Sequence, residues 1–205
     1  MAPSCSKLAA GMALGRPKQL FRKIRRMRRL KLGLVGSSQV RYYPLDTLED
    51  EHLEPIILST DPTRASEIIE TGKLHEIIST TLDQHRDMDA VFIFVGGNDV
   101  RVTSDVRVIG ENILTIAESF SNIGLLPIVM PLINRQYPLG IGVDQYTTIR
   151  NGVNRYLRRW YRRNGQRHNV LNFNDLKLQE DGVHLQRESY CEISRAIRIK
   201  MNIHF

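Results

Sequence analysis

The sequence predicts an α/β domain in which a parallel sheet is covered by helices on both faces. Two observations lead to this fold class. Short, almost continuously apolar runs alternate about five times with longer segments that repeat apolar residues at helical spacing. The apolar runs also lack the in–out alternation of half-exposed strands, which indicates strands buried on both faces. In such sheets, functional side chains gather where the strands end.

The composition is typical of one globular domain. A chain of 205 residues can bury a core of its own, and 41% hydrophobic with 25% charged residues is an ordinary balance. The sequence has no apolar run of about 18 residues that could span a membrane. Residues 1–30 also lack the apolar core of a secretory signal. We therefore expect an intracellular protein, cytoplasmic or nuclear, although a basic, acid-free N-terminus also fits a mitochondrial transit peptide.

The net charge of +7 is concentrated near the N-terminus. Residues 1–31 hold ten of the 29 Lys and Arg residues and no acidic residue, which leaves 19 basic side chains against 22 acidic ones elsewhere. We divide the chain into a basic segment, 1–30, flexible or a short helix, and a domain, 31–205. Residues 16–31 could bind nucleic acid, an acidic membrane surface or a partner. The alternative is a solvated tail.

The first part of the domain contains two candidates for its second strand. Residues 32–36 form the first predicted strand, which ends in a turn, and 45–53 predict a short helix. Residues 56–58 and 67–69 are each short enough for the second strand. We favour 67–69, with Gly72 ending it.

The middle of the domain repeats the strand–helix pattern. Helical spacing of apolar residues predicts a helix over 73–84. The run 90–95 is the clearest buried strand, and two glycines break it. A helix over 105–122 and a strand over 125–130 follow, and a proline stops that strand.

The last part of the chain predicts one more strand between two helices. A loop over 134–144 rich in Gly and Pro leads to a helix over 146–163. Residues 170–173 predict a short strand, 174–186 a loop, and 188–201 a closing helix.

The helix over 146–163 and its exit combine arginine with aromatic residues. They are Arg155, Arg158, Arg159, Arg162, Arg163 and Arg167, with Tyr156, Trp160 and Tyr161 between them. Such a mixture can bind nucleic acid through phosphate contacts and stacking. The alternative, which we favour, is an amphipathic helix that buries residues such as Ile149 and Val153 and leaves the arginines solvated.

Asp181 and His184 are the strongest catalytic candidates. They lie in Gln179-Glu-Asp-Gly-Val-His-Leu-Gln186, where Gly182 allows a tight bend between them. A carboxylate three residues from a histidine can hold one imidazole nitrogen and leave the other free. A general base that takes a proton from a hydroxyl nucleophile needs this arrangement. The alternative is a loop with an unrelated acid and a surface histidine.

Two other predicted strand ends supply a hydroxyl and an amide. Ser38 follows Gly36-Ser37 and could be a nucleophile, or it could only cap a helix. Asn98 follows Gly96-Gly97, and its amide is a suitable oxyanion donor because it needs no change of protonation. Asn98 could equally be a polar turn residue.

The sequence predicts neither a metal site nor a disulfide framework. Cys5 and Cys191 lie in the N-terminal segment and in a predicted helix, and the six histidines are scattered. Neither His-x-x-x-His nor Cys-x-x-Cys occurs.

Taken together, these residues resemble the ordered motifs of the SGNH (GDSL-type) hydrolase family. The matching blocks are Gly36-Ser37-Ser38, Gly72, Gly96-Gly97-Asn98-Asp99 and Asp181-Gly-Val-His184-Leu. The resemblance runs from about residue 31 to the C-terminus. It implies a three-layer α/β/α, flavodoxin-like fold with a five-stranded parallel sheet of order 2-1-3-4-5, and no metal or cofactor.

The resemblance also implies a serine esterase acting on a small-molecule or lipid ester. Ser38 would be the nucleophile, His184 the base and Asp181 the acid that orients it. The backbone amides of Ser38 and Gly72 and the side chain of Asn98 would form the oxyanion hole.

Three positions depart from the family pattern. Ser37 stands where the family usually has Asp, and Ser189 where it often has Gly. Gly72 is chosen by spacing, and residues 63–65 compete for its role. The alternative function is therefore a catalytically weakened protein of this fold that binds nucleic acid or a partner through its basic N-terminal segment.

Overall fold

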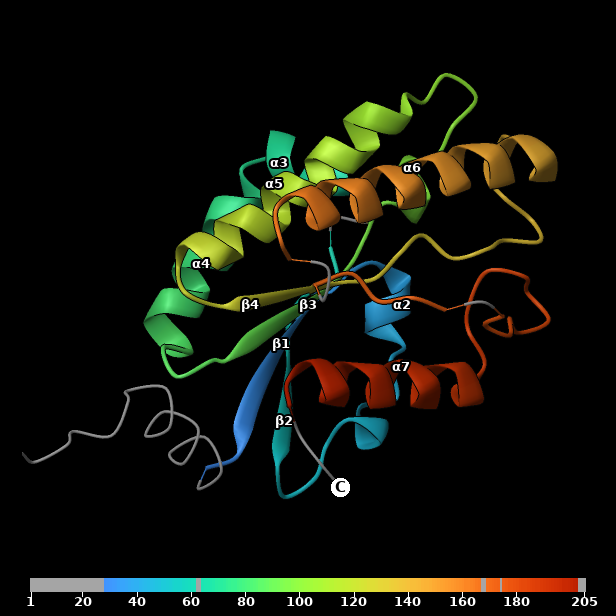
Figure 1. Cartoon of the computed structure of the whole chain (residues 1–205). Coiled ribbons are helices and arrows are strands. Elements are labelled where there is room, and N and C mark those ends of the chain that lie inside the picture. Colours follow the sequence, from blue (N-terminus) through green and yellow to red (C-terminus); the bar gives the residue numbers. More distant parts are fainter. Residues whose placement is uncertain (1–27, 62–63, 167–168, 174, 203–205) are drawn as a thin grey trace, which may run out of the picture.

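Four parallel strands form the sheet of the computed structural model, which describes residues 28–61, 64–166, 169–173 and 175–202. The strands are β1 Leu30–Gly36, β2 Leu53–Ser59, β3 Ala90–Phe94 and β4 Leu126–Val129. Their order is β2-β1-β3-β4, and every neighbouring pair is parallel. Helices cover both faces of this sheet (Figure 1), so the predicted α/β class is confirmed.

The long helices lie where helical spacing predicts them. The helical elements are α2 Ser38–Arg41, η1 Leu45–Thr47, α3 Ala65–Glu70, α4 Lys73–Gln84, η2 Gly97–Asp99, α5 Val106–Asn122, α6 Val143–Arg163 and α7 Arg187–Lys200. At the start of α5, the carboxylate of Asp105 accepts a hydrogen bond from the backbone N–H of Arg107 at 2.7 Å, which caps the helix. Within the described ranges, no helix has both the length and the apolar character needed to cross a membrane.

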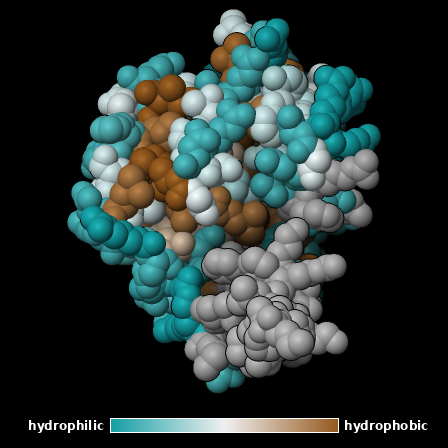
Figure 2. Space-filling model, turned by 60° about the vertical axis from the view of Figure 1, so that its left-hand side comes forward, coloured by the Kyte–Doolittle hydropathy of each residue, from teal (hydrophilic) through white to brown (hydrophobic). Residues whose placement is uncertain are grey.

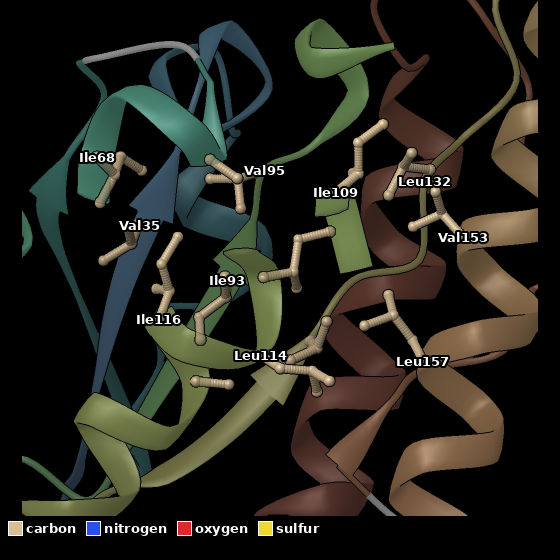
Figure 3. Packing of buried hydrophobic residues seen from close by; sticks show 14 of the residues in the cluster. Val35, Ile68, Ile93, Val95, Ile109, Leu114, Ile116, Leu132, Val153 and Leu157 are labelled. Atoms are coloured by element: carbon tan, nitrogen blue, oxygen red, sulfur yellow. The ribbon is translucent and has the colours of Figure 1, made fainter. Parts of the chain in front are cut away.

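The central strand β3 divides its side chains between two cores, because successive residues of a strand point to opposite faces. Val91 and Ile93 join the core formed with α3, α4, α5 and α6, part of which is shown in Figure 3. Phe92 and Phe94 join the core formed with α2 and α7. All five residues of β3 are buried. This strand therefore separates the two helical layers.

The second strand is not the segment that the sequence analysis favours. Residues 67–69 belong to α3, whereas 56–58 lie in β2, so that prediction is wrong. Pro55 lies opposite Leu32 of β1 in this strand. A proline lacks the N–H that a central strand needs, but β2 is at the edge of the sheet, where proline is tolerated.

Residues 170–173 do not form the predicted fifth strand. A single parallel bridge joins Val170 to Val129 of β4, and the N–H of Leu171 donates to the carbonyl of Val129 at 3.0 Å. Only the first four positions of the order 2-1-3-4-5 are present as strands in the described part of the chain. The chain thus passes along the outer edge of β4 without extending the sheet.

The start of the described chain is joined to the domain by ion pairs. Arg28 contacts the largely buried carboxylate of Asp89 at 2.6 Å, and Arg29 contacts Glu49 at 2.8 Å. Residues 1–27, which include most of the predicted basic segment and Cys5, lie outside the described residues. One face of the molecule is shown in Figure 2, where hydrophilic side chains surround an area of apolar ones.

Candidate active site

The loops that leave β1, β3 and β4 meet the loop before α7 at one end of the sheet. The Gln39 side chain, just after β1, contacts the carbonyl of Val183. Arg135, after β4, contacts Asn98 in η2, which follows β3. The next residue, Gln136, donates its backbone N–H to the carbonyl of Gly182 at 2.8 Å. These contacts form a continuous path that brings Ser38, Asn98 and the Asp181–His184 loop together.

Ser38 is the first residue of α2 and follows β1 after a sharp turn. Gly36 makes the turn possible, because a Cβ there would lie 2.8 Å from the Phe94 carbonyl oxygen and 2.3 Å from a Val40 methyl. Ser37, in place of the family Asp, is buried and makes no capping hydrogen bond through its side chain. Ser38 itself is half-buried.

Gln39 connects the turn that carries Ser38 to the loop that carries His184. Its side chain is 2% exposed, and its Nε2 donates to the carbonyl of Val183 at 2.7 Å. Its Oε1 accepts a hydrogen bond from the hydroxyl of Tyr190 in α7 at 2.8 Å. Both polar ends of the amide are satisfied, so the connection is stable in a buried environment.

The Asp181–His184 loop is the tip of a short hairpin. An antiparallel bridge joins Leu178 to Leu185, and Gly182 turns the chain with φ of 63°. The carboxylate Oδ1 of Asp181 accepts hydrogen bonds from the backbone N–H groups of Val183 at 2.8 Å and His184 at 2.9 Å. The other oxygen, Oδ2, lies 2.5 Å from Nδ1 of His184.

These contacts set the charge and tautomer of the pair. The hydrogen bond with His184, together with the backbone donors of Val183 and His184, lowers the pKa of Asp181 to about 2. An ionised carboxylate can only accept, so Nδ1 of His184 carries the hydrogen. In the neutral imidazole, Nε2 is then the acceptor, which is the atom that a general base uses.

Nε2 of His184 is buried and has no hydrogen-bond partner in the part of the chain that is described. It is therefore not bonded to Ser38 Oγ. The side chain of His184 is 23% exposed, and the ring of Tyr42 packs edge-on against it with centroids 5.3 Å apart. Without substrate, hydrogen bonds of this kind are often long and tighten on binding.

Arg135 determines how the amide of Asn98 is oriented. Its Nη2 donates to Asn98 Oδ1 at 2.7 Å. Because a guanidinium has no acceptor, the amide oxygen must face Arg135 and the amide –NH2 must face another direction. Arg135 is 9% exposed, and its guanidinium lies 5.9 Å from the centroid of the Tyr146 ring.

Helix α6 holds the loop that carries Arg135. The buried side chain of Asn154 accepts from the N–H of Leu132 at 2.8 Å and donates to its carbonyl at 2.9 Å. The hydroxyl of Tyr146 donates to the carbonyl of Ile133 at 3.2 Å. The position of Arg135 is therefore a consequence of packing between α6 and the exit of β4.

Gly72 follows a helix and not a strand. It adopts φ of 74° in the turn between α3 and α4, and its N–H donates to the carbonyl of Ile69 at 3.3 Å. The prediction that it ends a strand is wrong because 67–69 is helical, whereas its predicted role as an oxyanion donor stays a prediction. Ala65, in the competing segment 63–65, does contact the site, since its N–H and that of Ser66 donate to the carboxylate of Asp99, the residue after Asn98, at 2.8 and 3.0 Å.

Sequence reasoning missed Gln39 and Arg135. A usable signal existed for Arg135, because it follows a predicted strand in the same way as Asn98 does. Gln39 had no such signal, since its role depends on the carbonyl of Val183, distant in the sequence. The described residues contain no group of three or more His, Cys, Asp or Glu side chains placed to hold a metal ion.

Comparison with known proteins supports this reading of the fold. No family model and no curated protein matches the sequence. Among solved structures, a proposed SGNH hydrolase from Slackia heliotrinireducens is similar with a TM-score of 0.60 at 12% identity, covering 84% of this chain and 99% of the other. The chain has the fold of SGNH and GDSL-type hydrolases.

Two esterases show the same likeness. The psychrotrophic esterase EstA from Pseudoalteromonas sp. has a TM-score of 0.57 at 15% identity, covering 84% of this chain and 96% of EstA. Est24, a carbohydrate acetylesterase from Sinorhizobium meliloti, has a TM-score of 0.55 at 16% identity, covering 86% and 100%. At such identities the likeness establishes the fold, and the reaction has to be argued from the site.

Proposed function

We propose that the protein is a serine esterase that cleaves a small-molecule or lipid ester with Ser38 as nucleophile. The observation that carries this proposal is the hydrogen bond from Gln39 to the carbonyl of Val183, at 2.7 Å. The residue after Ser38 is bonded to the residue before His184, so a hydroxyl and an imidazole belong to two loops in direct contact. Acyl transfer requires this pairing.

Acylation begins when Nε2 of His184 takes the proton from Ser38 Oγ as that oxygen attacks the ester carbonyl. Asp181 stays ionised and stabilises the imidazolium through the 2.5 Å contact to Nδ1. The imidazolium then gives its proton to the departing alcohol. Water, activated by the same His184, attacks the acyl-enzyme and releases the acid with Ser38 restored.

We assign two donors to the developing oxyanion, each supported by a local contact or position. The N–H of Ser38 lies in the first turn of α2, where backbone donors have no acceptor within the helix. The –NH2 of Asn98 is the second donor, and the hydrogen bond between Arg135 and Asn98 Oδ1 determines its direction. We do not assign a role to Gly72, whose N–H is bonded within its own turn.

The replacement of the family Asp by Ser37 does not remove any of these groups. Ser37 is buried, and its carbonyl accepts hydrogen bonds from the N–H groups of Val40 at 2.9 Å and Arg41 at 3.1 Å. These bonds close the turn that presents Ser38. Activity is therefore compatible with serine at this position.

Covalent labelling tests the proposal. A fluorophosphonate should modify the native protein, and digestion should place the adduct on the peptide that contains Ser38. The Ser38→Ala variant should neither be labelled nor hydrolyse a short-chain aryl ester, whereas Ser37→Ala should keep the label. Labelling of another residue, or equal hydrolysis by Ser38→Ala, would refute the proposed nucleophile.

The alternative is a binding protein that uses the basic N-terminal segment. Residues 16–27 of the proposed contact region 16–31 lie outside the described residues, and Arg28 and Arg29 pair with acidic side chains of the domain. No described contact favours nucleic acid at this segment. The alternative therefore remains a prediction, tested by deleting residues 1–27 and measuring salt-sensitive RNA or DNA binding.

A further inference from the structure

A groove runs along one flank of α6, beside the exit of β4. The opposite wall is formed by residues 130–134, which leave β4, and by Phe173, Asp175 and Leu176. Its volume is about 660 Å³, which lies within the range of small-molecule sites. A smaller hollow of about 340 Å³ shares Arg158 and Arg162 with it and continues beside Val170–Asn172. The groove thus follows the edge of the sheet formed by β4, beside which the described residues 170–173 make a single bridge.

The lining of this groove is strongly basic. Five arginines of α6 contribute to it: Arg150, Arg155, Arg158, Arg159 and Arg162. Asp175 is the single acidic residue of the lining. Within the described ranges, none of the five forms an ion pair with a carboxylate. Like charges at spacings of three and four residues repel one another along a helix, so an anion in the groove would relieve this repulsion.

Two buried polar atoms, one on a residue that lines the groove and one on a residue that lines the smaller hollow, lack a hydrogen-bond partner among the described residues. The Nε of Arg150 is buried without a hydrogen-bond acceptor among the described residues, although its Nη2 donates to Asn151 at 2.8 Å. The hydroxyl of Tyr161, a residue only 2% exposed, has no partner there either. Buried polar groups are almost always bonded, so these atoms indicate that the groove takes a polar ligand.

We propose that this groove binds a small, multiply charged phosphate compound. Arginine is suited to phosphate because its planar fork donates two parallel hydrogen bonds to two oxygens. Several such forks along one concave wall fit a compound with more than one phosphate group better than a single anion. The volume of about 660 Å³ favours a small molecule, since a nucleic-acid strand binds in grooves that track its backbone.

The groove is separate from the proposed catalytic residues, and phosphate binding there would be a further function beside the proposed hydrolysis. Its lining includes Asn134, next to Arg135, but none of Ser38, Asp181 or His184. Asn154, which lines the groove, also binds the backbone of Leu132 and so supports the loop that leads to Arg135. Occupancy of the groove therefore does not require a reactive serine, and the two proposals can fail independently.

Calorimetric titration with inorganic tripolyphosphate tests the proposal on the full chain. The native protein and Ser38→Ala should bind it equally, with an affinity that falls as salt is added. Replacing both Arg158 and Arg162 with Gln should weaken binding by about 100-fold, roughly tenfold for each lost charged donor. The matched control replaces Arg163 and Arg195, both exposed and outside the groove, with Gln. It should bind tripolyphosphate with the affinity of the native protein.

Three results would overturn the assignment. The first is no binding by the native protein, and the second is an equal loss in the control variant, which would show attraction by net charge alone. The third is tighter binding of a short single-stranded RNA than of tripolyphosphate, lost in the same groove variant. That outcome would make the groove a nucleic-acid channel. Tighter binding of ATP than of tripolyphosphate, with the same loss, would support an organic phosphate as the ligand.

Discussion

Arg135 and Asn98 are joined by a 2.7 Å hydrogen bond between the exits of two neighbouring strands, β4 and β3. The bond runs from the guanidinium to the amide oxygen, so it determines which face of the Asn98 amide presents its –NH2. Arg135 is in turn packed on Tyr146 of α6. A residue that contacts no catalytic nucleophile or base thus controls the direction of a proposed oxyanion donor.

We expect Arg135→Met to lower kcat for an aryl ester by up to about 100-fold with little change in KM. The physical reason is a misdirected Asn98 amide, since small displacements of positioning groups have costs of this size. Arg135→Lys should recover part of the loss because it retains a donor. Circular dichroism melting would separate this effect from unfolding, and an unchanged kcat in a folded Arg135→Met protein would contradict the role.

Asn98→Ala should reduce kcat by roughly 100- to 1,000-fold, as expected for the loss of one oxyanion donor. Fluorophosphonate labelling of Ser38 should become slower but remain detectable, because the nucleophile and base are intact. The rate of ester hydrolysis by Ser38→Ala, measured in the same assay, gives the lower limit for comparison. If Asn98→Ala retained native turnover, the amide would be only a turn residue.

Asp181→Asn should reduce kcat by about 10,000-fold while the fold is retained. The neutral amide can donate to Nδ1 of His184, which would then hold its hydrogen on Nε2 and could not take the proton of Ser38. Nitrogen-15 NMR of the His184 ring would report the change of tautomer directly. The matched control is Asp175→Asn, because Asp175 is exposed and is not one of the three proposed catalytic residues. It should have the kcat of the native protein.

The pKa of Asp181, lowered to about 2, gives a pH prediction. In His184→Ala its largest cause is removed, so the pKa should rise toward the usual value of 3.8. Because a lowered carboxyl pKa stabilises the fold above the unfolded value, this contribution should be complete above about pH 4 and lost as pH falls toward 2. Carbon-detected NMR titration of the carboxyl group measures the shift, and identical curves for both proteins would contradict the hydrogen-bond explanation.

Gln39→Leu should destabilise the protein by on the order of 1–3 kcal/mol, because the part-buried carbonyl of Val183 loses its donor and the hydroxyl of Tyr190 keeps only the backbone carbonyl of residue 39 as a partner. It should also reduce kcat, since the loops of Ser38 and His184 lose their shared contact. Gln145→Leu, at an exposed position of α6, is the control. Urea unfolding and ester hydrolysis measured together would test both parts, and native stability in Gln39→Leu would refute the connection.

The fold was predictable where local pattern and tertiary environment agree. Strand 90–95 is buried on both faces and reads as continuously apolar, and the helix over 105–122 repeats its apolar residues at helical spacing. The predicted second strand at 67–69 was wrong, because its two isoleucines belong to a short helix, α3. A pair of adjacent isoleucines fits a buried strand equally well in the sequence. The prediction also failed at 170–173, where a strand-like run makes one bridge only.

The candidate site was partly predictable for a similar reason. Asp181 and His184 are close in sequence, so their contact is local and depends on a glycine turn that the chain itself encodes. The donor predicted at Gly72 stays a prediction without structural support, because Gly72 follows a helix and not the second strand. Arg135 was overlooked although it follows a strand, since an arginine in a loop has many other uses.

The layered α/β class, the positions of the long helices and the local geometry of the turn from Asp181 to His184 are encoded locally in the chain. These features depend on apolar periodicity and on contacts between residues a few positions apart. Three other features become visible only in the folded molecule: Gln39 binds Val183, Arg135 orients Asn98, and arginines of α6 line a groove. Such relationships join residues that are distant along the chain, and packing of the two helical layers on the sheet brings them together.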